Sequence, residues 1–145
     1  MNPIRRALVA AFVFALVRPL SALAAWNKDA FGAKTAGDAL KGLGVVNATP
    51  TQDVSVEVPQ IAENGSVVPI EISSAIPGTT ALIVVIDKNP FPLISRFDFN
   101  EGALPFVKLN VKMGETSDVR VLAEAAGKYY VTTREVKVTI GGCGG

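Results

Sequence analysis

The stretch TALIVVID, residues 80–87, decides the fold class because it is a short and continuous apolar run. Turn-forming residues stand on both sides of it, with Pro77 and Gly78 before it and Asn89 and Pro90 after it. A run of this length between turn signals is typical of a strand that is covered on both faces. We therefore predict a central strand here, with other parts of the protein packed against both of its sides.

Six further segments have the composition of strands, and the first of them alternates valine with serine and glutamate. The six are VSVEV (54–58), VVPIEI (67–72), SRFDF (95–99), PFVKLNVKM (105–113), SDVRVLAEA (117–125) and KYYVTTREVKVTI (128–140). Asn64 and Gly65 form a hairpin-type turn signal between the first two. Seven short strands with a turn every dozen or so residues predict an all-β fold, an immunoglobulin-like antiparallel β-sandwich of about seven strands.

Two positions interrupt the regular strand pattern. Pro69 lies within VVPIEI and cannot donate a backbone hydrogen bond, so we expect a sheet edge or a bulge there. In the last segment the apolar residues change from odd positions, Tyr129 and Val131, to even positions, beginning with Val136. Because successive side chains of a strand face opposite sides, we predict a bulge or a change of sheet between residues 132 and 135.

A short helical segment is expected before the strands, between residues 27 and 43. Apolar residues recur there at roughly helical spacing, and Asn27 is a suitable N-cap. Gly32 and Gly37 interrupt the pattern, so the segment can divide into two pieces. We predict an amphipathic N-terminal helical segment that lies across the sheet.

The beginning of the chain has the pattern of a cleaved export signal. Arg5 and Arg6 precede an apolar stretch, residues 7–17, which is too short to span a bilayer. Small residues further on suit cleavage between Ala24 and Ala25. The adjacent arginines favour the twin-arginine route, which exports protein that has already folded.

With cleavage at this point, the sequence predicts a signal peptide followed by a mature chain of two parts. We expect a signal peptide at 1–24, a sandwich domain with its N-terminal helix at 25–140, and a terminal arm at 141–145. The mature chain carries 13 acidic and 11 basic side chains, so it has no basic excess to bind nucleic acid or an anionic membrane. We expect neither nucleic acid nor membrane as a partner of the mature protein.

The chain contains one cysteine, Cys143, and no histidine. The absence of histidine removes the usual general base and the Ser–His and Cys–His pairs of nucleophilic catalysis. A single cysteine without histidine also cannot build a thiolate or imidazole metal site. We therefore expect no self-contained enzyme, no metal site and no cofactor. In an exported protein the lone cysteine is an incidental residue, an intermolecular bridge or a reactive thiol.

Cys143 lies among four glycines at the end of the chain. They are Gly141, Gly142, Gly144 and Gly145. Because glycine adopts many backbone conformations, we expect a thin, flexible arm that places the thiol roughly 10 Å beyond Ile140. No neighbouring residue in the sequence activates the thiol, so its chemistry is expected to come from an active site that receives the arm.

The terminal GGCGG, preceded by REVKVTI, resembles the C-terminus of the SoxY family of the thiosulfate-oxidising Sox system. The similarity continues upstream through VEVPQIAENGSVVPIEI, VIDKNPFPL and VKMGETSDVRVLAEAAGKYY, and it includes AFGAKTAGDALKGLG. It covers nearly all of the chain after the export signal. One departure is Phe91, because a small polar residue is expected in the family between the two prolines.

The resemblance implies a periplasmic sulfur carrier rather than an enzyme. It implies that a c-type haem enzyme, SoxAX, joins Cys143 oxidatively to the sulfane sulfur of thiosulfate. The dimanganese hydrolase SoxB then releases sulfate, and the molybdenum–haem sulfane dehydrogenase SoxCD oxidises the remaining sulfur. It also implies a heterodimer with SoxZ, a small sandwich protein without its own export signal, whose export with the folded carrier favours the twin-arginine route.

The surface that meets SoxZ is expected at the apolar loop PFPLI, because it is more apolar than a sandwich loop requires. Its residues are Pro90, Phe91, Pro92, Leu93 and Ile94. The alternative is that this loop folds back over the end of the sandwich.

Two other functions stay open at this point. A C-terminal Gly-Gly is also typical of ubiquitin-like sulfur carriers, which bear sulfur on the terminal carboxyl group after activation by ATP. Those proteins have a β-grasp fold and act in the cytoplasm, so the export signal and the seven strands argue against them. The other alternative is a structural sandwich that dimerises through a disulfide of Cys143.

Overall fold

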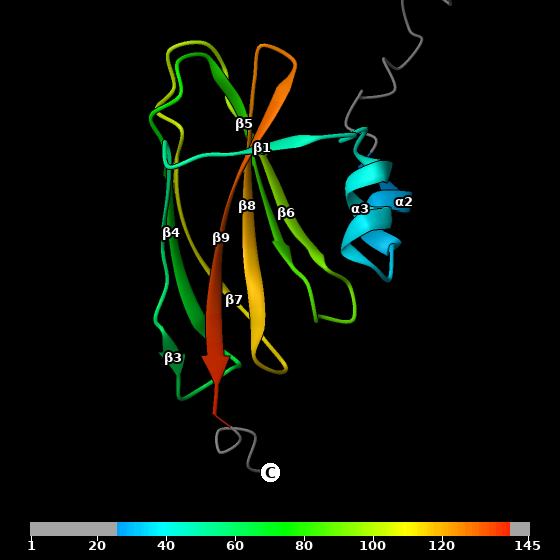
Figure 1. Ribbon diagram of the computed structural model, residues 1–145, viewed down its shortest axis with the longest axis vertical. Coiled ribbons are helices and arrows are strands. Elements are labelled where there is room, and N and C mark those ends of the chain that lie inside the picture. The colour runs from blue at the N-terminus through cyan, green and yellow to red at the C-terminus, as the bar shows by residue number, and fades with distance from the viewer. Residues whose placement is uncertain (1–25, 140–145) are drawn as a thin grey trace, which may run out of the picture.

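The computed structural model describes residues 26–139, so the predicted export signal and the glycine arm lie outside the described residues. Within this range nine strands form two sheets (Figure 1). The strands are β1 (Ala48–Pro50), β2 (Val54–Glu57), β3 (Ile61–Ala62), β4 (Val68–Ser74), β5 (Thr79–Ile86), β6 (Leu93–Asp98), β7 (Phe106–Val111), β8 (Ser117–Ala125) and β9 (Lys128–Val138). The predicted all-β sandwich is confirmed, and β1 and β3 are the two strands that the sequence pattern did not reveal.

The two sheets differ in size and in strand direction. The larger sheet has the order β1-β9-β8-β5-β6, with β3 also paired to β9, and the smaller sheet has the order β2-β4-β7. The pairings are antiparallel except those of β1 and β3, which run parallel to β9. The main core lies between the sheets, and it is formed by the inward-facing aliphatic side chains of both.

Strand β5 is covered on both faces, as its sequence predicts. Its residues from Ala81 to Ile86 are completely buried. Leu82 and Val84 belong to the core between the sheets, whereas Ile83 belongs to a second cluster on the opposite face, beneath the helices. This is why an unbroken apolar run, rather than an alternating one, forms this strand.

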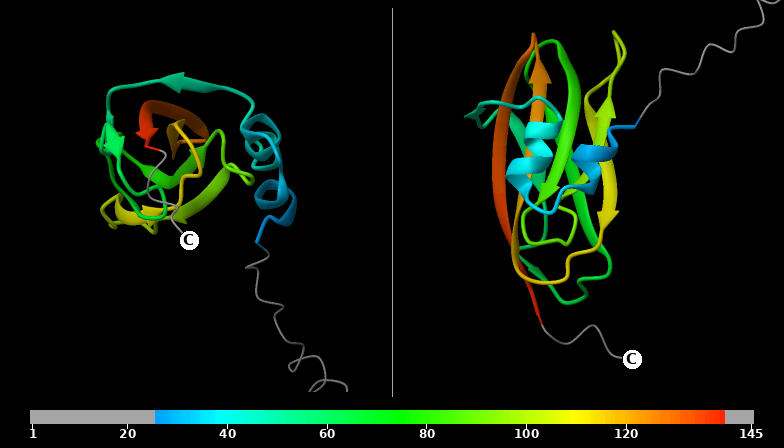
Figure 2. Two further views of the ribbon diagram at one scale, coloured as in Figure 1. Left: turned by 90° about the horizontal axis from the view of Figure 1, so that it is seen from below. Right: turned by 90° about the vertical axis from the view of Figure 1, so that its right-hand side faces the viewer.

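Two short helices cover the outer face of the larger sheet (Figure 2). They are α2 (Lys28–Gly32) and α3 (Ala36–Gly42). Asn27 caps α2 as predicted, because its Oδ1 accepts the N–H of Ala30 at 2.9 Å. Its Nδ2 also donates to the carbonyl of Gly42 at 2.7 Å, so one side chain joins the start of α2 to the end of α3.

The sheet edge expected at Pro69 is present at that residue, although not along the whole of its strand. Strand β4 is not an edge strand, because it lies between β2 and β7. However, β2 pairs with β4 only at residues 71–74, so at Pro69 the strand has β7 as its single neighbour. A proline is tolerated at this position because it interrupts no pairing with β2.

The predicted bulge or change of sheet at residues 132–135 is wrong. β9 pairs with β8 in one unbroken register from Lys128 to Val136. Tyr129 and Val131 pack against the cluster beneath the helices, while Val136 faces the core between the sheets. The change from odd to even positions arises because the helices cover the first part of this strand and the smaller sheet covers the second.

One side of the sandwich is closed by a single stretch of chain. This stretch pairs with β9 as β1, joins the smaller sheet as β2, and returns to β9 as β3. Between β1 and β2, the N–H of Thr51 donates to the carbonyl of Val131 at 3.0 Å, and its carbonyl accepts the hydroxyl of the buried Thr132 at 2.8 Å. The closing segment therefore holds β9 along its outer edge.

An ion-pair network crosses the outer face of the larger sheet. Arg96 on β6 pairs across β5 with Glu124 on β8 at 2.8 Å, and it also pairs with Asp98 on its own strand. Burial alone would lower the pKa of Arg96, but its hydrogen bonds with Asp98 and Glu124 outweigh this effect and raise it. The guanidinium is therefore a fixed positive charge that links β6 to β8 across β5.

Candidate functional site

The predicted sulfur-binding residue, Cys143, lies outside the described residues. The same holds for the four arm glycines, for Arg5 and Arg6, and for Ala24 and Ala25. The structure does describe the place from which the arm begins, because β9 leads directly to Thr139 at one end of the sandwich (Figure 1).

The last described residues of the chain are held on one edge by β3. The N–H of Lys137 donates to the carbonyl of Gln60 at 3.0 Å, and the N–H of Thr139 donates to the carbonyl of Ala62 at 3.1 Å. These bonds continue the parallel pairing of β9 beyond the end of its longer partner, β8.

On the opposite edge a side chain takes the place of a strand. β8 begins at Ser117, opposite Val136, so the pairing with β8 ends there. The next amide that faces this edge, the N–H of Val138, donates to Oγ1 of Thr116 at 3.0 Å. The end of β9 is thus hydrogen-bonded on both edges, up to Val138 on this edge and up to Thr139 on the edge of β3.

The loops around this end are joined to one another. Nδ2 of Asn89 donates to the carbonyl of Lys112 at 2.7 Å, which links the β5–β6 loop to the β7–β8 loop. The N–H of Met113 donates to the carbonyl of Gly65 at 2.7 Å, which links the β7–β8 loop to the β3–β4 loop. We expect these cross-links to make this end of the sandwich a rigid support for the arm.

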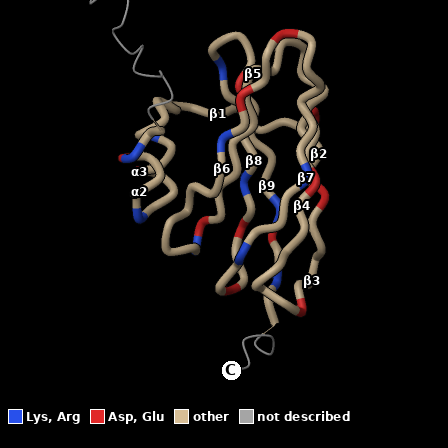
Figure 3. Tube along the Cα trace, turned by 180° about the vertical axis from the view of Figure 1, so that it is seen from behind, with Lys and Arg blue, Asp and Glu red and all other residues tan. Residues whose placement is uncertain are grey.

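The described residues contain no cluster of metal-ligating side chains. Within residues 26–139 no three His, Cys, Asp or Glu side chains lie close enough together to hold a metal ion. In this range no helix has the length and apolar character of a membrane-spanning segment. Acidic and basic residues alternate along the chain trace rather than gathering by sign (Figure 3).

The loop predicted to meet a partner divides into a buried and an exposed part. Pro92 and Leu93 are buried, and Leu93 packs in the cluster beneath the helices. Ile94 is half-buried, whereas Pro90 and Phe91 are exposed, Phe91 with 49% of its surface accessible. The loop therefore packs beneath the N-terminal helices through Leu93 and against the core between the sheets through Ile94, and it presents Pro90 and Phe91 to solvent.

Phe91 forms part of an exposed group that the sequence did not predict, named here the aromatic patch and made of Trp26, Phe31 and Phe91. The rings of Trp26 and Phe31 lie 5.3 Å apart, and Trp26 is 65% exposed. All three residues line one open hollow of about 580 Å³. The ammonium of Lys34 lies 3.5 Å from the centre of the Phe91 ring. Only the fold brings these residues together, so no local sequence pattern reveals the patch.

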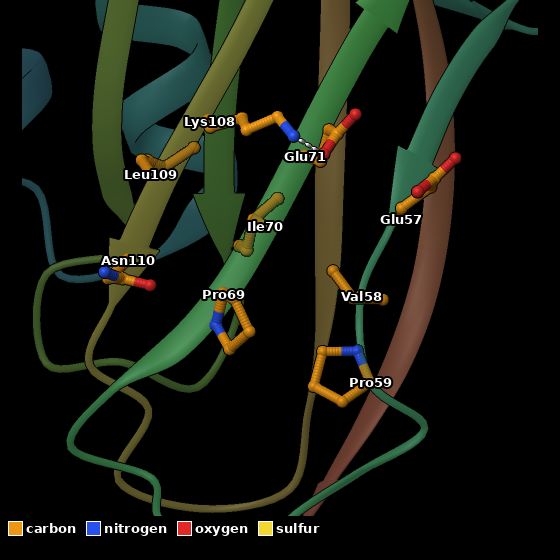
Figure 4. A pocket seen from close by; sticks show the side chains of 9 residues that line it. All are labelled: Glu57, Val58, Pro59, Pro69, Ile70, Glu71, Lys108, Leu109 and Asn110. Atoms are coloured by element: carbon orange, nitrogen blue, oxygen red, sulfur yellow. Dashed lines mark ion pairs between the residues drawn. The ribbon is translucent and has the colours of Figure 1, made fainter.

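A second hollow lies on the smaller sheet, where β2 ends (Figure 4). Pro59, Pro69 and Asn110 line its lower part, and Lys108 pairs with Glu71 above them. Its lining contains no thiol, hydroxyl or unpaired cation. We assign no chemistry to this hollow.

Comparison with known proteins points to one family. The family model described as sulfur oxidation protein SoxY matches residues 42–143. The sulfur carrier protein SoxY from Chlorobium limicola f thiosulfatophilum has a similar solved structure, with a TM-score of 0.64 and 34% sequence identity. That match covers 70% of this chain and 92% of the other.

A more distant likeness concerns the fold alone. A superoxide reductase (neelaredoxin) from Ignicoccus hospitalis has a TM-score of 0.53 at 13% identity, with 68% of this chain and 87% of that chain covered. Among curated proteins no match was found.

Proposed function

The chain belongs to the SoxY family of sulfur oxidation proteins, and on this basis we propose that it carries sulfur in thiosulfate oxidation with Cys143 as the attachment site. The observation that carries the proposal is the family match, which extends to residue 143 and so includes the only cysteine of the chain. The protein is then a covalent carrier, and its partners supply the catalysis.

The first chemical step is an oxidative coupling at the sulfur of Cys143. The thiol loses its proton, a bond forms between Sγ and the sulfane sulfur of thiosulfate, and two electrons leave to an oxidising partner. The product is a cysteine S-thiosulfonate. We propose the c-type haem enzyme SoxAX as the partner that accepts these electrons.

The later steps keep the sulfur attached to the carrier. Water attacks the sulfur of the terminal sulfonate group, and the bond between this sulfur and the sulfane sulfur breaks. Sulfate and a proton are released, and a persulfide remains on Cys143. We assign this hydrolysis to the dimanganese enzyme SoxB. Further oxidation of the persulfide sulfur, with water as the oxygen source, is assigned to the sulfane dehydrogenase SoxCD. Covalent attachment prevents the reactive intermediate from diffusing away between these enzymes.

The described structure supports a carrier because the anchored end of β9 lies just before the glycine-rich sequence that contains Cys143. The end of β9 is held by β3 and by Thr116, and the glycine-rich sequence begins two residues beyond Thr139. A fixed origin followed by residues without Cβ atoms lets one thiol enter narrow channels of different shape.

Location and export follow from the same proposal. We propose that residues 1–24 are removed at export and that the mature protein acts in the periplasm. SoxZ, which lacks an export signal of its own, then has to cross the membrane together with the folded carrier. Arg5 and Arg6 fit this need because the twin-arginine route transports folded protein.

Intact-mass spectrometry of the protein from cells grown on thiosulfate tests the proposal against the two alternatives. Sulfur-containing adducts on Cys143 support the carrier. Added mass on the terminal carboxyl group supports a ubiquitin-like carrier, although the sandwich differs from the β-grasp fold which that function requires. A doubled mass that a reductant removes, without any sulfur adduct, supports a structural dimer and contradicts the carrier.

A bulkier arm is expected to transfer sulfur more slowly. Gly144→Val adds a Cβ-branched side chain next to Cys143, which stiffens and thickens the arm. We expect turnover to fall roughly tenfold or more with at least one Sox enzyme, because a reacting sulfur that is misplaced loses rate steeply. Turnover with each enzyme is measured separately, with Gly144→Ala as the milder control. Unchanged rates with every enzyme for Gly144→Val would contradict a role for the thin arm.

The aromatic patch is proposed as the contact with SoxZ, together with the exposed part of the loop Pro90–Ile94. Trp26 and Phe91 are the large, exposed rings that dominate many protein interfaces. The Lys34 ammonium above Phe91 favours an acidic residue on the partner. Phe91 is also where the sequence departs from the expected family pattern, so it can adapt the carrier to its own partner.

Truncating the patch is expected to weaken the complex while the fold persists. Trp26→Ala and Phe91→Ala should each raise the Kd for SoxZ about tenfold or more. Leu104→Ala is the matched control, because this side chain is 84% exposed but lies in the β6–β7 connection at the other end of the sandwich. Isothermal titration measures all three. A large loss for Leu104→Ala with none for Trp26→Ala would place the interface elsewhere.

A further inference from the structure

Gly65 has no conformational reason to be glycine. The sequence places it in an Asn-Gly turn signal, where glycine normally supplies a positive φ. Its φ is not in that region, unlike those of Gly44 and Gly78. The turn is made instead by Asn64, whose Oδ1 accepts the N–H of Ser66 at 2.9 Å. Another cause must therefore explain the missing side chain.

The cause is the close approach of the end of β9. A Cβ atom at Gly65 would lie 2.4 Å from the carbonyl oxygen of Met113 and 2.9 Å from Cγ1 of Val138. Neither contact is tolerable without a shift of the neighbours. Val138 packs here against the core between the sheets, and Gly65 is itself buried. The bare backbone at Gly65 is the surface on which the end of β9 rests.

Three hydrogen bonds also hold the end of β9 in this position. They run from the amides of residues 137, 138 and 139 to Gln60, Thr116 and Ala62 in turn. Because β8 no longer pairs beyond Val136, these bonds and the packing on Gly65 are what hold the last three described residues. We name the group of Gln60, Ala62, Gly65, Met113 and Thr116 the root socket.

We propose that the root socket sets the length of the tether, and that Gly65 and Thr116 are positioning residues for sulfur transfer. This inference rests on the proposed carrier function of Cys143. From Thr139 the thiol is four residues away, a reach of about 14 Å at full extension. If the socket opens back to Val136, the distance becomes seven residues and the reach about 25 Å.

A short tether has a physical advantage for a carrier. The effective concentration of a tethered group falls steeply as the tether becomes longer than the distance it must span. A socket that ends the strand at a defined residue keeps the thiol near the end of the sandwich to which β9 leads. Opening the socket lengthens the arm without any change in its sequence.

Pulsed electron spin resonance measures this length directly. Spin labels are attached to Cys143 and to a second cysteine, Lys128→Cys, which is an exposed position at the far end of β9. The mature protein is used in complex with SoxZ. Gly65→Ala and Thr116→Val open the socket, and each should move the upper limit of the label distances outward by about 10 Å. Hydrogen exchange of the amides of residues 137–139 should become at least about tenfold faster.

Two controls separate positioning from a general loss of stability. Gly114→Ala adds a methyl group one residue from Met113, but into open space and without a positive φ. Thr116→Ser keeps the hydroxyl that accepts from Val138. Both controls should retain the distances of the unmodified protein.

The outcomes decide the proposal independently of sulfur chemistry, because the measurement needs neither thiosulfate nor a Sox enzyme. Unchanged distances in Gly65→Ala and in Thr116→Val overturn the root socket, even if Cys143 proves to carry sulfur. If Gly65→Ala fails to fold, Thr116→Val decides alone, since it removes one hydroxyl from a half-buried side chain. Lower stability with unchanged distances would show a structural role only.

Discussion

Cys143→Ser should abolish thiosulfate-dependent turnover of the reconstituted Sox system, down to the rate measured without any carrier. A serine hydroxyl replaces the thiol with almost the same shape, but it cannot form the sulfur–sulfur bond to thiosulfate. It also remains protonated where a thiolate forms, so it offers no comparable nucleophile. The assay follows electrons released from thiosulfate, and intact-mass spectrometry of the same samples should find no sulfur adduct.

The variant should otherwise behave as the unmodified protein. Its substitution lies outside residues 26–139, which contain both hydrophobic clusters, so the unfolding temperature and the affinity for SoxZ should not change. Alkylation of the unmodified protein provides a matched chemical control, because Cys143 is the only cysteine and iodoacetamide blocks it selectively. Residual turnover by Cys143→Ser or by the alkylated protein would refute Cys143 as the attachment site.

Leu82→Ala and Ile83→Ala should each lower the free energy of unfolding by about 2 to 5 kcal/mol. The two residues are neighbours on β5 and are both completely buried, although their side chains face opposite sides of the sheet. Leu82 packs between the sheets, whereas Ile83 packs beneath α2 and α3. Truncation leaves a cavity in either place, and chemical denaturation monitored by circular dichroism measures the loss.

Ile83→Ala is the more informative of the two because it tests the helical layer. If the helices did not cover this face, Ile83 would lie on a solvent-exposed surface and its truncation would cost less than about 0.5 kcal/mol. Val67→Ala, at an aliphatic residue with 55% of its surface exposed, serves as the control and should stay within that limit. A cost for Ile83→Ala as small as that of the control would contradict a packed helical layer.

The parts of the fold that the sequence predicted are those with strong local signals. The continuous apolar run of β5 predicts a strand covered on both faces, since an alternating strand would leave one face polar. Asn27 predicts the start of α2 because its side chain caps an amide three residues later. In both cases the pattern and its structural cause lie within a few residues of each other.

The parts that the sequence missed depend on neighbours far away in the chain. β1 and β3 have three and two residues, too few for a periodic pattern, and they become strands because the edge of β9 is available to them. The odd-to-even change in β9 looked like a bulge because periodicity does not reveal which layer covers each half of a strand.

The candidate site also has one part that the sequence reveals and other parts that only the fold reveals. Composition singles out Cys143, because one cysteine among four glycines is visible without a structure. The root socket is not visible, since Gly65 resembles an ordinary turn glycine until Val138 and the Met113 carbonyl are seen against it. The aromatic patch is missed for a similar reason, because only the packing of the helices brings Trp26 to Phe91.

The parallel pairing of β1 and β3 with β9 imposes an order on biosynthesis. Of the strands in residues 26–139, β9 is the last to leave the ribosome, yet it supplies the edge on which two of the first three pair and the whole length along which β8 pairs. Contacts so distant in sequence form late and slowly. A chain truncated before β9 leaves an open sheet edge and exposed core residues, which chaperones and proteases recognise. The sandwich can therefore be complete only after β9, the strand that leads toward Cys143, has been synthesised.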